Sequence, residues 1–113
     1  MILSLAAALL LAQAAESPPP PPEVARAAEA LAACVQDRLN QAEDDVRPEV
    51  IADAIIAHCR PQQEALMASH ARWVQASDLS EREKARSLRE TERSMRGMRG
   101  QLIRSIRQDR RGR

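Results

Sequence analysis

The sequence predicts an all-α protein: a disulfide-linked antiparallel helical hairpin followed by one or two further helices, the last long, basic and partly exposed. Three observations support this prediction. Apolar residues recur at three- and four-residue steps over most of the chain, which is the spacing of amphipathic helices. The two cysteines fall in the two arms of one predicted hairpin, and the cationic residues concentrate toward the C-terminus.

Residues 1–14 have the features of a secretory signal peptide. An apolar run over residues 2–12 precedes Ala12 and Ala14, small residues at the positions that a signal peptidase reads. The run is shorter than the roughly 20 apolar residues of a membrane-spanning helix. We therefore expect cleavage after Ala14, a periplasmic or secreted location, and no transmembrane helix in the mature chain. Retention as an uncleaved anchor and burial as a first helix stay open, because no basic residue precedes the run.

Residues 15–22 are expected to form a proline-rich spacer. They end in five consecutive prolines, Pro18 to Pro22. Such a run favours the extended polyproline II conformation and acts as a semi-rigid connector. We expect the folded part to begin immediately after it, with a helical hairpin domain over residues 23–77.

The first arm of the hairpin has an apolar stripe, and so has the second arm after a turn near Val46. Pro48 suits the first turn of the second helix, where a backbone N–H has no partner. Asp44 and Asp45 are expected to cap that helix. The two expected stripes consist of Val24, Ala28, Leu31, Val35, Leu39 and Ala42, and of Val50, Ile51, Ala54, Ile55, His58 and Cys59.

An antiparallel fold about this turn places Cys34 opposite Cys59, because facing residues have numbers that sum to about 93. The same register pairs Val35 with His58 and Leu39 with Ala54. We therefore predict a disulfide between the two cysteines, which would stabilise the hairpin by about 3 kcal/mol in the chain-entropy model.

Two other interpretations of the cysteines stay open. One is a pair of free thiols. The other is a metal- or redox-handling site built from Cys34, His58, Cys59 and His70. The chain has no CxxC or paired-histidine spacing, and neighbouring residues such as His58 and Cys59 point about 100° apart on a helix.

Pro61 is expected to open a third helical segment or to kink the second one. Its apolar positions form a broken stripe that includes His70 and Trp73. Trp73 is the only large aromatic side chain in the sequence. We expect it to close the open end of the hairpin as a core residue; exposure as an anchor for a partner is the alternative.

Residues 78–113 are expected to form a basic amphipathic helix and tail. Ser80 with Glu83, or Asp78 with Glu81, has the spacing of a capping box. A narrow apolar stripe then follows a nearly heptad step, which is compatible with a coiled coil or homodimer. Its members are Leu88, Thr91, Met95, Met98, Leu102 and Ile106.

Charge is segregated along the chain. Residues 1–77 carry a net charge of −5 and residues 78–113 a net charge of +6. The basic segment could bind an envelope protein, an anionic surface, or the acidic hairpin of its own chain. Nucleic acid is disfavoured by the export signal and by the lack of aromatic residues for base stacking. The candidate partner-binding residues are Arg93, Arg96, Arg99, Arg104 and Arg107.

The sequence contains no motif of a common catalytic or cofactor site. Its three glycines all lie in the basic segment and form no phosphate-binding loop. No nucleophile elbow, zinc-protease or calcium-loop pattern occurs. We therefore expect a non-catalytic binding or structural module of the cell envelope, with no cofactor and no metal.

Overall fold

The computed structural model describes residues 19–112, and it confirms the all-α fold class. The predicted signal peptide and the first part of the proline-rich spacer lie outside the described residues. Five helices follow one another in the described part: α2 (Pro22–Asn40), α3 (Pro48–His58), α4 (Arg60–Ala76), α5 (Glu81–Arg96) and α6 (Met98–Arg111).

Helix α2 begins one residue earlier than expected, at the last proline of the spacer. Pro22 occupies the first helical turn, where its missing N–H costs no hydrogen bond. Val24 and Leu31 are buried, whereas Ala28, which the sequence places in the same stripe, is exposed.

The predicted disulfide between Cys34 and Cys59 is confirmed. The two Cα atoms lie 6.0 Å apart, and Cys59 is completely buried. Cys59 lies between the last residue of α3 and the first residue of α4. The bridge therefore ties the middle of α2 to the bend between the two helices that follow it.

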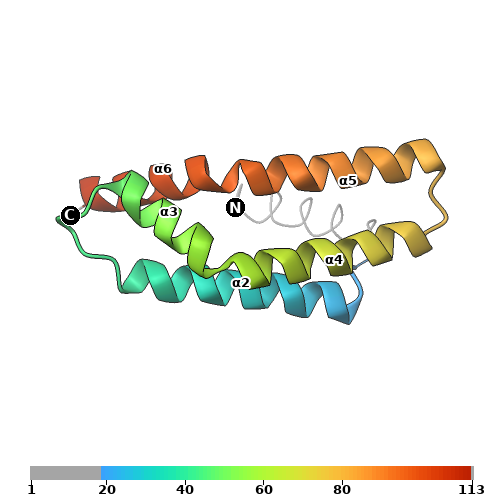
Figure 1. The fold of residues 1–113 in the computed structure, drawn as a ribbon, viewed down its shortest axis with the longest axis horizontal. Coiled ribbons are helices and arrows are strands. Elements are labelled where there is room, and N and C mark those ends of the chain that lie inside the picture. Colours follow the sequence, from blue (N-terminus) through green and yellow to red (C-terminus); the bar gives the residue numbers. More distant parts are fainter. Residues whose placement is uncertain (1–18, 113) are drawn as a thin grey trace, which may run out of the picture.

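The helices form two long layers, α2 with α4 and α5 with α6, and α3 crosses between them (Figure 1). Helix α4 packs along α2, and α5 runs back beside α4. Helix α6 continues the direction of α5 and packs against α3. Because α3 and α4 meet at an angle, α3 crosses from α2 to α6 instead of lying along α2.

The buried face of α3 differs from the expected one. Of the expected stripe, Ile51, Ile55 and Cys59 are buried, as predicted. Val50, Ala54 and His58 of that stripe are exposed, and Ala52, which was not part of it, is buried. The predicted pairs of Leu39 with Ala54 and Val35 with His58 are therefore wrong. The physical reason is that α3 packs between α2 and α6, so its apolar face turns toward the space between two helices.

One of the two expected helix caps is present. Ser80 Oγ accepts a hydrogen bond from the backbone N–H of Glu83, whose side chain accepts one from the backbone N–H of Ser80. At α3, by contrast, Arg47 is the N-cap residue and makes no side-chain cap, so the expected capping by Asp44 and Asp45 is wrong. Pro48 does lie in the first turn of α3, as predicted.

A single apolar core joins the disulfide to the C-terminal helix. Leu102, Ile103 and Ile106 of α6 are buried against the hairpin. The basic segment is therefore part of the folded body, and the long last helix is interrupted only near Gly97. The buried cluster consists of Leu31, Ile51, Ala52, Ile55, Cys59, Leu102, Ile103 and Ile106.

Within residues 19–112, no helix has both the length and the apolar content needed to cross a membrane.

Candidate anion-binding surface

Helices α5 and α6 behave as one rod with a slight interruption. The backbone N–H of Gly97 donates to the carbonyl of Arg93 at 3.0 Å, and Gly97 accepts from Gln101 at 3.2 Å. Both bonds have the four-residue spacing of an α-helix, and Gly97 keeps a right-handed helical conformation. Helical periodicity therefore runs across the junction.

Charged contacts dock α6 on the acidic hairpin. Arg99 Nε donates to Asp53 Oδ1 at 2.7 Å, and Arg107 forms an ion pair with Glu49. Arg110 donates to the backbone carbonyl of Val46 at 2.6 Å, beside the turn that precedes α3. The basic segment thus binds the acidic hairpin of its own chain through Arg99, Arg107 and Arg110, which was one of the possibilities considered for it.

These contacts favour the charged state of both acids. The hydrogen bond from Arg99 lowers the pKa of Asp53, and the same bond raises the pKa of Arg99. The pKa of Glu49 is lowered first by hydrogen bonding from its own backbone N–H, in the first turn of α3, and further by the charge of Arg107.

The five candidate arginines fall into two groups. Arg99 and Arg107 make ion pairs within the chain. Arg93, Arg96 and Arg104 are exposed. Within residues 19–112, the side chains of these last three make no hydrogen bond or ion pair.

The structure adds four arginines that the sequence interpretation had omitted. Seven arginines of α5 and α6 are exposed, and across the described residues their side chains have no bonded partner in the chain. On a continuous helix their positions fall within about 40° of one line. We call these seven residues the arginine row: Arg82, Arg86, Arg89, Arg93, Arg96, Arg104 and Arg111.

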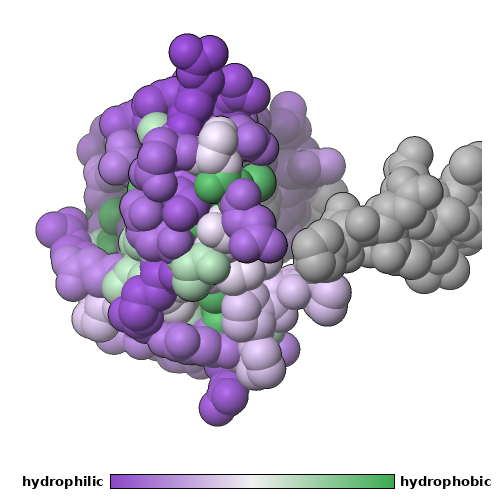
Figure 2. Space-filling view, turned by 90° about the vertical axis from the view of Figure 1, so that its right-hand side faces the viewer, coloured by the Kyte–Doolittle hydropathy of each residue, from purple (hydrophilic) through white to green (hydrophobic). Residues whose placement is uncertain are grey.

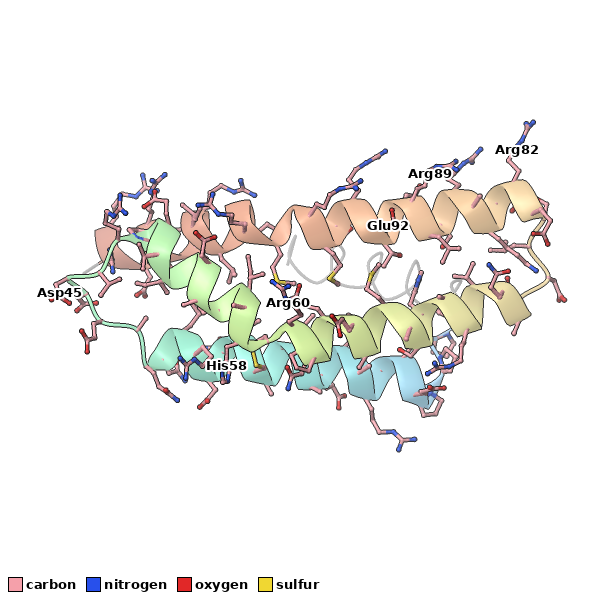
Figure 3. The ribbon with its side chains drawn as sticks, in the orientation of Figure 1. Asp45, His58, Arg60, Arg82, Arg89 and Glu92 are labelled. Carbon is pink, nitrogen blue, oxygen red and sulfur yellow. A yellow bond between two sulfur atoms is a disulfide. The ribbon has the colours of Figure 1, made fainter. Side chains whose placement is uncertain are left out.

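The arginine row lies away from the packed face of α5. Arg82 and Arg89 project from the outer edge of the helix, on the side opposite α4 (Figure 3). Leu88 and Met95 are half-buried about half a turn away from that edge. The helix can therefore pack through Leu88 and Met95 while its arginines face solvent on the opposite side. The alternating steps of four and three residues from Arg82 to Arg96 were readable in the sequence and could have identified the part of the row on α5.

A shallow hollow of about 500 Å³ lies near the end of the row. Arg104 and Arg111 line it together with Arg107, Arg110 and Pro48. Because Arg107 and Arg110 already bind the hairpin, Arg104 and Arg111 are the members of this hollow available to an anion. The guanidinium group offers planar donors that match carboxylate or phosphate oxygens.

The residues of the expected metal or redox site do not converge. Cys34 and Cys59 are joined to each other, and His58 is exposed (Figure 3). His70 lies on α4, where its Nδ1 is 3.2 Å from the hydroxyl of Thr91 on α5. Within the described part of the chain, no group of three or more His, Cys, Asp or Glu residues could hold a metal ion.

Trp73 is half-buried, so it is neither the fully buried core residue nor the exposed anchor considered from the sequence. Its ring meets His70 edge to face, with ring centroids 5.9 Å apart. Together with Leu79 they line a mainly apolar groove of about 350 Å³ between α4 and the start of α5. Figure 2 looks onto this end of the molecule and shows hydrophobic residues reaching the surface among hydrophilic ones.

No known protein family, curated protein or solved structure matches the chain. The arginine row and the charged docking of α6 are accordingly the observations on which a functional assignment can rest.

Proposed function

We propose that this chain is a small exported helical protein that binds an anionic component of the cell envelope without catalysing a reaction. The arginine row supports the proposal: seven exposed guanidinium groups lie on one line and have no bonded partner within the described residues. Like charges along a helix repel one another, so such a row is stabilised by an external anion.

The way α6 is docked supports a binding surface of fixed shape. Leu102 and Ile106 are buried, and Arg99 is bonded to Asp53. The α6 part of the row, Arg104 and Arg111, is thus presented by a helix whose opposite side is held by the core, which limits the entropy lost on binding there. The heptad-like stripe packs inside the chain, an arrangement that favours a partner at the arginine row over a homodimer through that stripe.

Export is supported by the disulfide together with the apolar N-terminal run. A disulfide persists in oxidising compartments such as the periplasm or the extracellular space, and it is rare in the reducing cytosol. The intact mass of the natural protein under non-reducing conditions tests this part of the proposal. We expect a chain that begins at Ala15 and has lost two hydrogens; a reduced chain that still carries Met1 would contradict export.

The alternative, a metal- or redox-handling protein, requires Cys34, His58, Cys59 and His70 to act together. No contact among the described residues favours it, because the cysteines are joined and the two histidines lie on different helices. Titration of free thiols under denaturing conditions tests it, and two reactive thiols in the natural protein would favour it.

Deletion of the basic segment is an unsuitable test of binding, because it would remove Leu102, Ile103 and Ile106 from the core. Substitution is better. R86Q/R93Q removes two charges from the middle of the arginine row, and glutamine has nearly the helix propensity of arginine. R26Q/R60Q is the matched control, since Arg26 and Arg60 are exposed but lie on other helices.

Sedimentation of the oxidised protein with envelope fragments measures binding. We expect the wild-type protein and R26Q/R60Q to sediment at about 20 mM salt and to be released at about 500 mM, where charges are screened within a few ångströms. R86Q/R93Q should remain largely in the supernatant at both salt concentrations. Equal sedimentation of the two double variants would contradict a role for the row.

A further inference from the structure

The arginine row is long and narrow, and its spacing is regular along α5. From Arg82 to Arg111 it extends over about 43 Å. The five arginines of α5 are separated by about one helical turn each, or 5.4 Å, whereas Arg104 and Arg111 each follow after about two turns. The repeat along α5 is comparable to the length of one sugar residue in an extended polysaccharide. The cations of α5 can therefore meet successive anionic groups of a linear polymer, and Arg104 and Arg111 can meet groups further along it.

Acidic residues border the row along α5. Glu83 and Glu90 lie about 80° to 100° to one side of it, and Glu92 lies about 80° to the other side. Figure 3 shows Glu92 on the side of the helix, away from the outer edge that carries Arg82 and Arg89. The positive strip is consequently about one side chain wide, which suits a single polyanionic chain lying along the rod.

The surroundings of the row offer little to partners that need apolar contacts. Within residues 19–112, the exposed large hydrophobic residues are Val50 and Leu79, and neither belongs to α5 or α6. The apolar groove that Leu79 lines with Trp73 lies between α4 and α5, whereas the row lies on the side of α5 opposite α4. A stable protein interface usually has an apolar centre with aromatic anchors. An amphipathic helix inserts its apolar face into lipid, yet the apolar residues of α6 are buried in the core.

We infer that the ligand of the arginine row is a linear acidic glycan, whose carboxylate or phosphate groups bind the guanidinium groups along α5 and α6. This inference rests on the proposed function. Glycans of this class are hydrophilic, so they require neither an apolar anchor nor an aromatic stacking platform. Binding is by charge-assisted hydrogen bonds and releases counterions, which makes the affinity strongly dependent on salt.

Substitution of Gly100 provides a test in which binding is expected to become tighter. Gly100 lies on the same line as the row, between Arg96 and Arg104, and is the one position there without a cation. A Cβ at this position would meet the flexible end of the Arg104 side chain at 3.4 Å, which can move. G100R therefore fills the gap between Arg96 and Arg104, while G100A changes only the backbone preference.

Calorimetric titration of the full oxidised chain with oligogalacturonates, which are linear carboxylated glycans, tests the inference. The affinity should increase with oligomer length and level off near the row's length of about 43 Å. R86Q/R93Q should weaken binding about tenfold, because two cations of the row are lost, and R26Q/R60Q should change it less than about twofold. G100R should bind more tightly than G100A.

The other outcomes separate this inference from the proposed function. Vesicles containing phosphatidylglycerol serve as the lipid probe, at the same salt concentration. Row-dependent binding to vesicles, with glycan binding that is weak or independent of length, would overturn the glycan ligand and retain an anion-binding function. Failure of both probes to distinguish R86Q/R93Q from R26Q/R60Q would overturn the glycan ligand and the proposed function together.

Discussion

The two ends of the molecule bury their apolar residues to very different degrees. At the disulfide end, formed by α3, α6 and residues 31–42, three helices enclose a core that includes Ile55 and Cys59, with exposed fractions of 2% and 0%. At the tryptophan end, formed by α4, α5 and residues 22–30, α5 contributes no buried residue. One end is thus stabilised by a cluster of buried apolar residues, whereas the tryptophan end buries only Val24, Ser69 and Val74 among the described residues.

Polar contacts partly replace burial at the tryptophan end. His70 is hydrogen-bonded to Thr91, and Lys84 donates to the backbone carbonyl of Gln75 at 2.9 Å. The capping box of Ser80 fixes the start of α5. Segments with few buried apolar contacts open at lower free energy than core helices. Since five of the seven arginines of the row lie on α5, most of the proposed binding surface belongs to the less stable end.

Removal of the disulfide should have the largest effect on stability. We expect C34A/C59A to lower the free energy of unfolding by about 3 kcal/mol, because the unfolded chain regains the entropy of the closed loop. Urea denaturation followed by circular dichroism measures the change. The loss should concern the disulfide end, so amide hydrogen exchange in α3 and α6 should accelerate more than exchange in α5.

Reduction of the wild-type protein is the control for that variant, since it breaks the bond and leaves both sulfurs in place. It should lower the urea midpoint to a similar extent. An unchanged midpoint in C34A/C59A and in the reduced protein would show that the core alone stabilises the hairpin.

Truncation of one apolar residue at each end compares the two ends directly. We expect I55A to lower the free energy of unfolding by about 2–4 kcal/mol, because Ile55 is buried among three helices and the truncation leaves a cavity. L88A should cost about 1 kcal/mol or less, because Leu88 is only half-buried. Urea denaturation measures both, and equal losses would refute the difference in packing.

Local features of the structure were predictable from the sequence. The pairing of Cys34 with Cys59 was predicted from one hairpin register and is confirmed, although the other pairs tested from that register were wrong. The capping box at Ser80 and the helical position of Pro48 depend on residues within a turn of each other. The spacing of the arginine row was equally local, although only five candidate arginines were chosen, and two of these turned out to bind the hairpin.

The faces that helices present to one another were less predictable, because they depend on where remote segments pack. The buried face of α3 is set by α6, which lies some 50 residues later in the sequence. Charge segregation indicated attraction between the two halves, but Asp53 could not be assigned to Arg99 without the position of α6. The half-burial of Trp73 likewise depends on the start of α5.

Substitution of Gly97 should stabilise the rod on which the row lies. A Cβ at Gly97 would contact only the carbonyls of Arg93 and Ser94, both at an ordinary 3.5 Å, and the backbone is already helical. We expect G97A to raise the free energy of unfolding by about 0.5–1 kcal/mol, because alanine is the better helix former. Slower amide exchange in α5 should accompany it; a loss of stability would indicate that the interruption is required for docking α6.

The smallest expected effect concerns the charged contacts that dock α6. Because the pKa values of Asp53 and Glu49 are lower in the folded protein, the unfolded chain binds more protons in the acid range. The free energy of unfolding should therefore fall as the pH drops below the ordinary carboxyl pKa of about 4. In D53N the free energy of unfolding should fall less steeply with decreasing pH. D78N should show the same fall as the wild-type protein, since Asp78 makes no ion pair among residues 19–112. Urea midpoints measured between neutral and acid pH test this, and identical profiles for D53N and the wild-type protein would show that the pair with Arg99 adds nothing to docking.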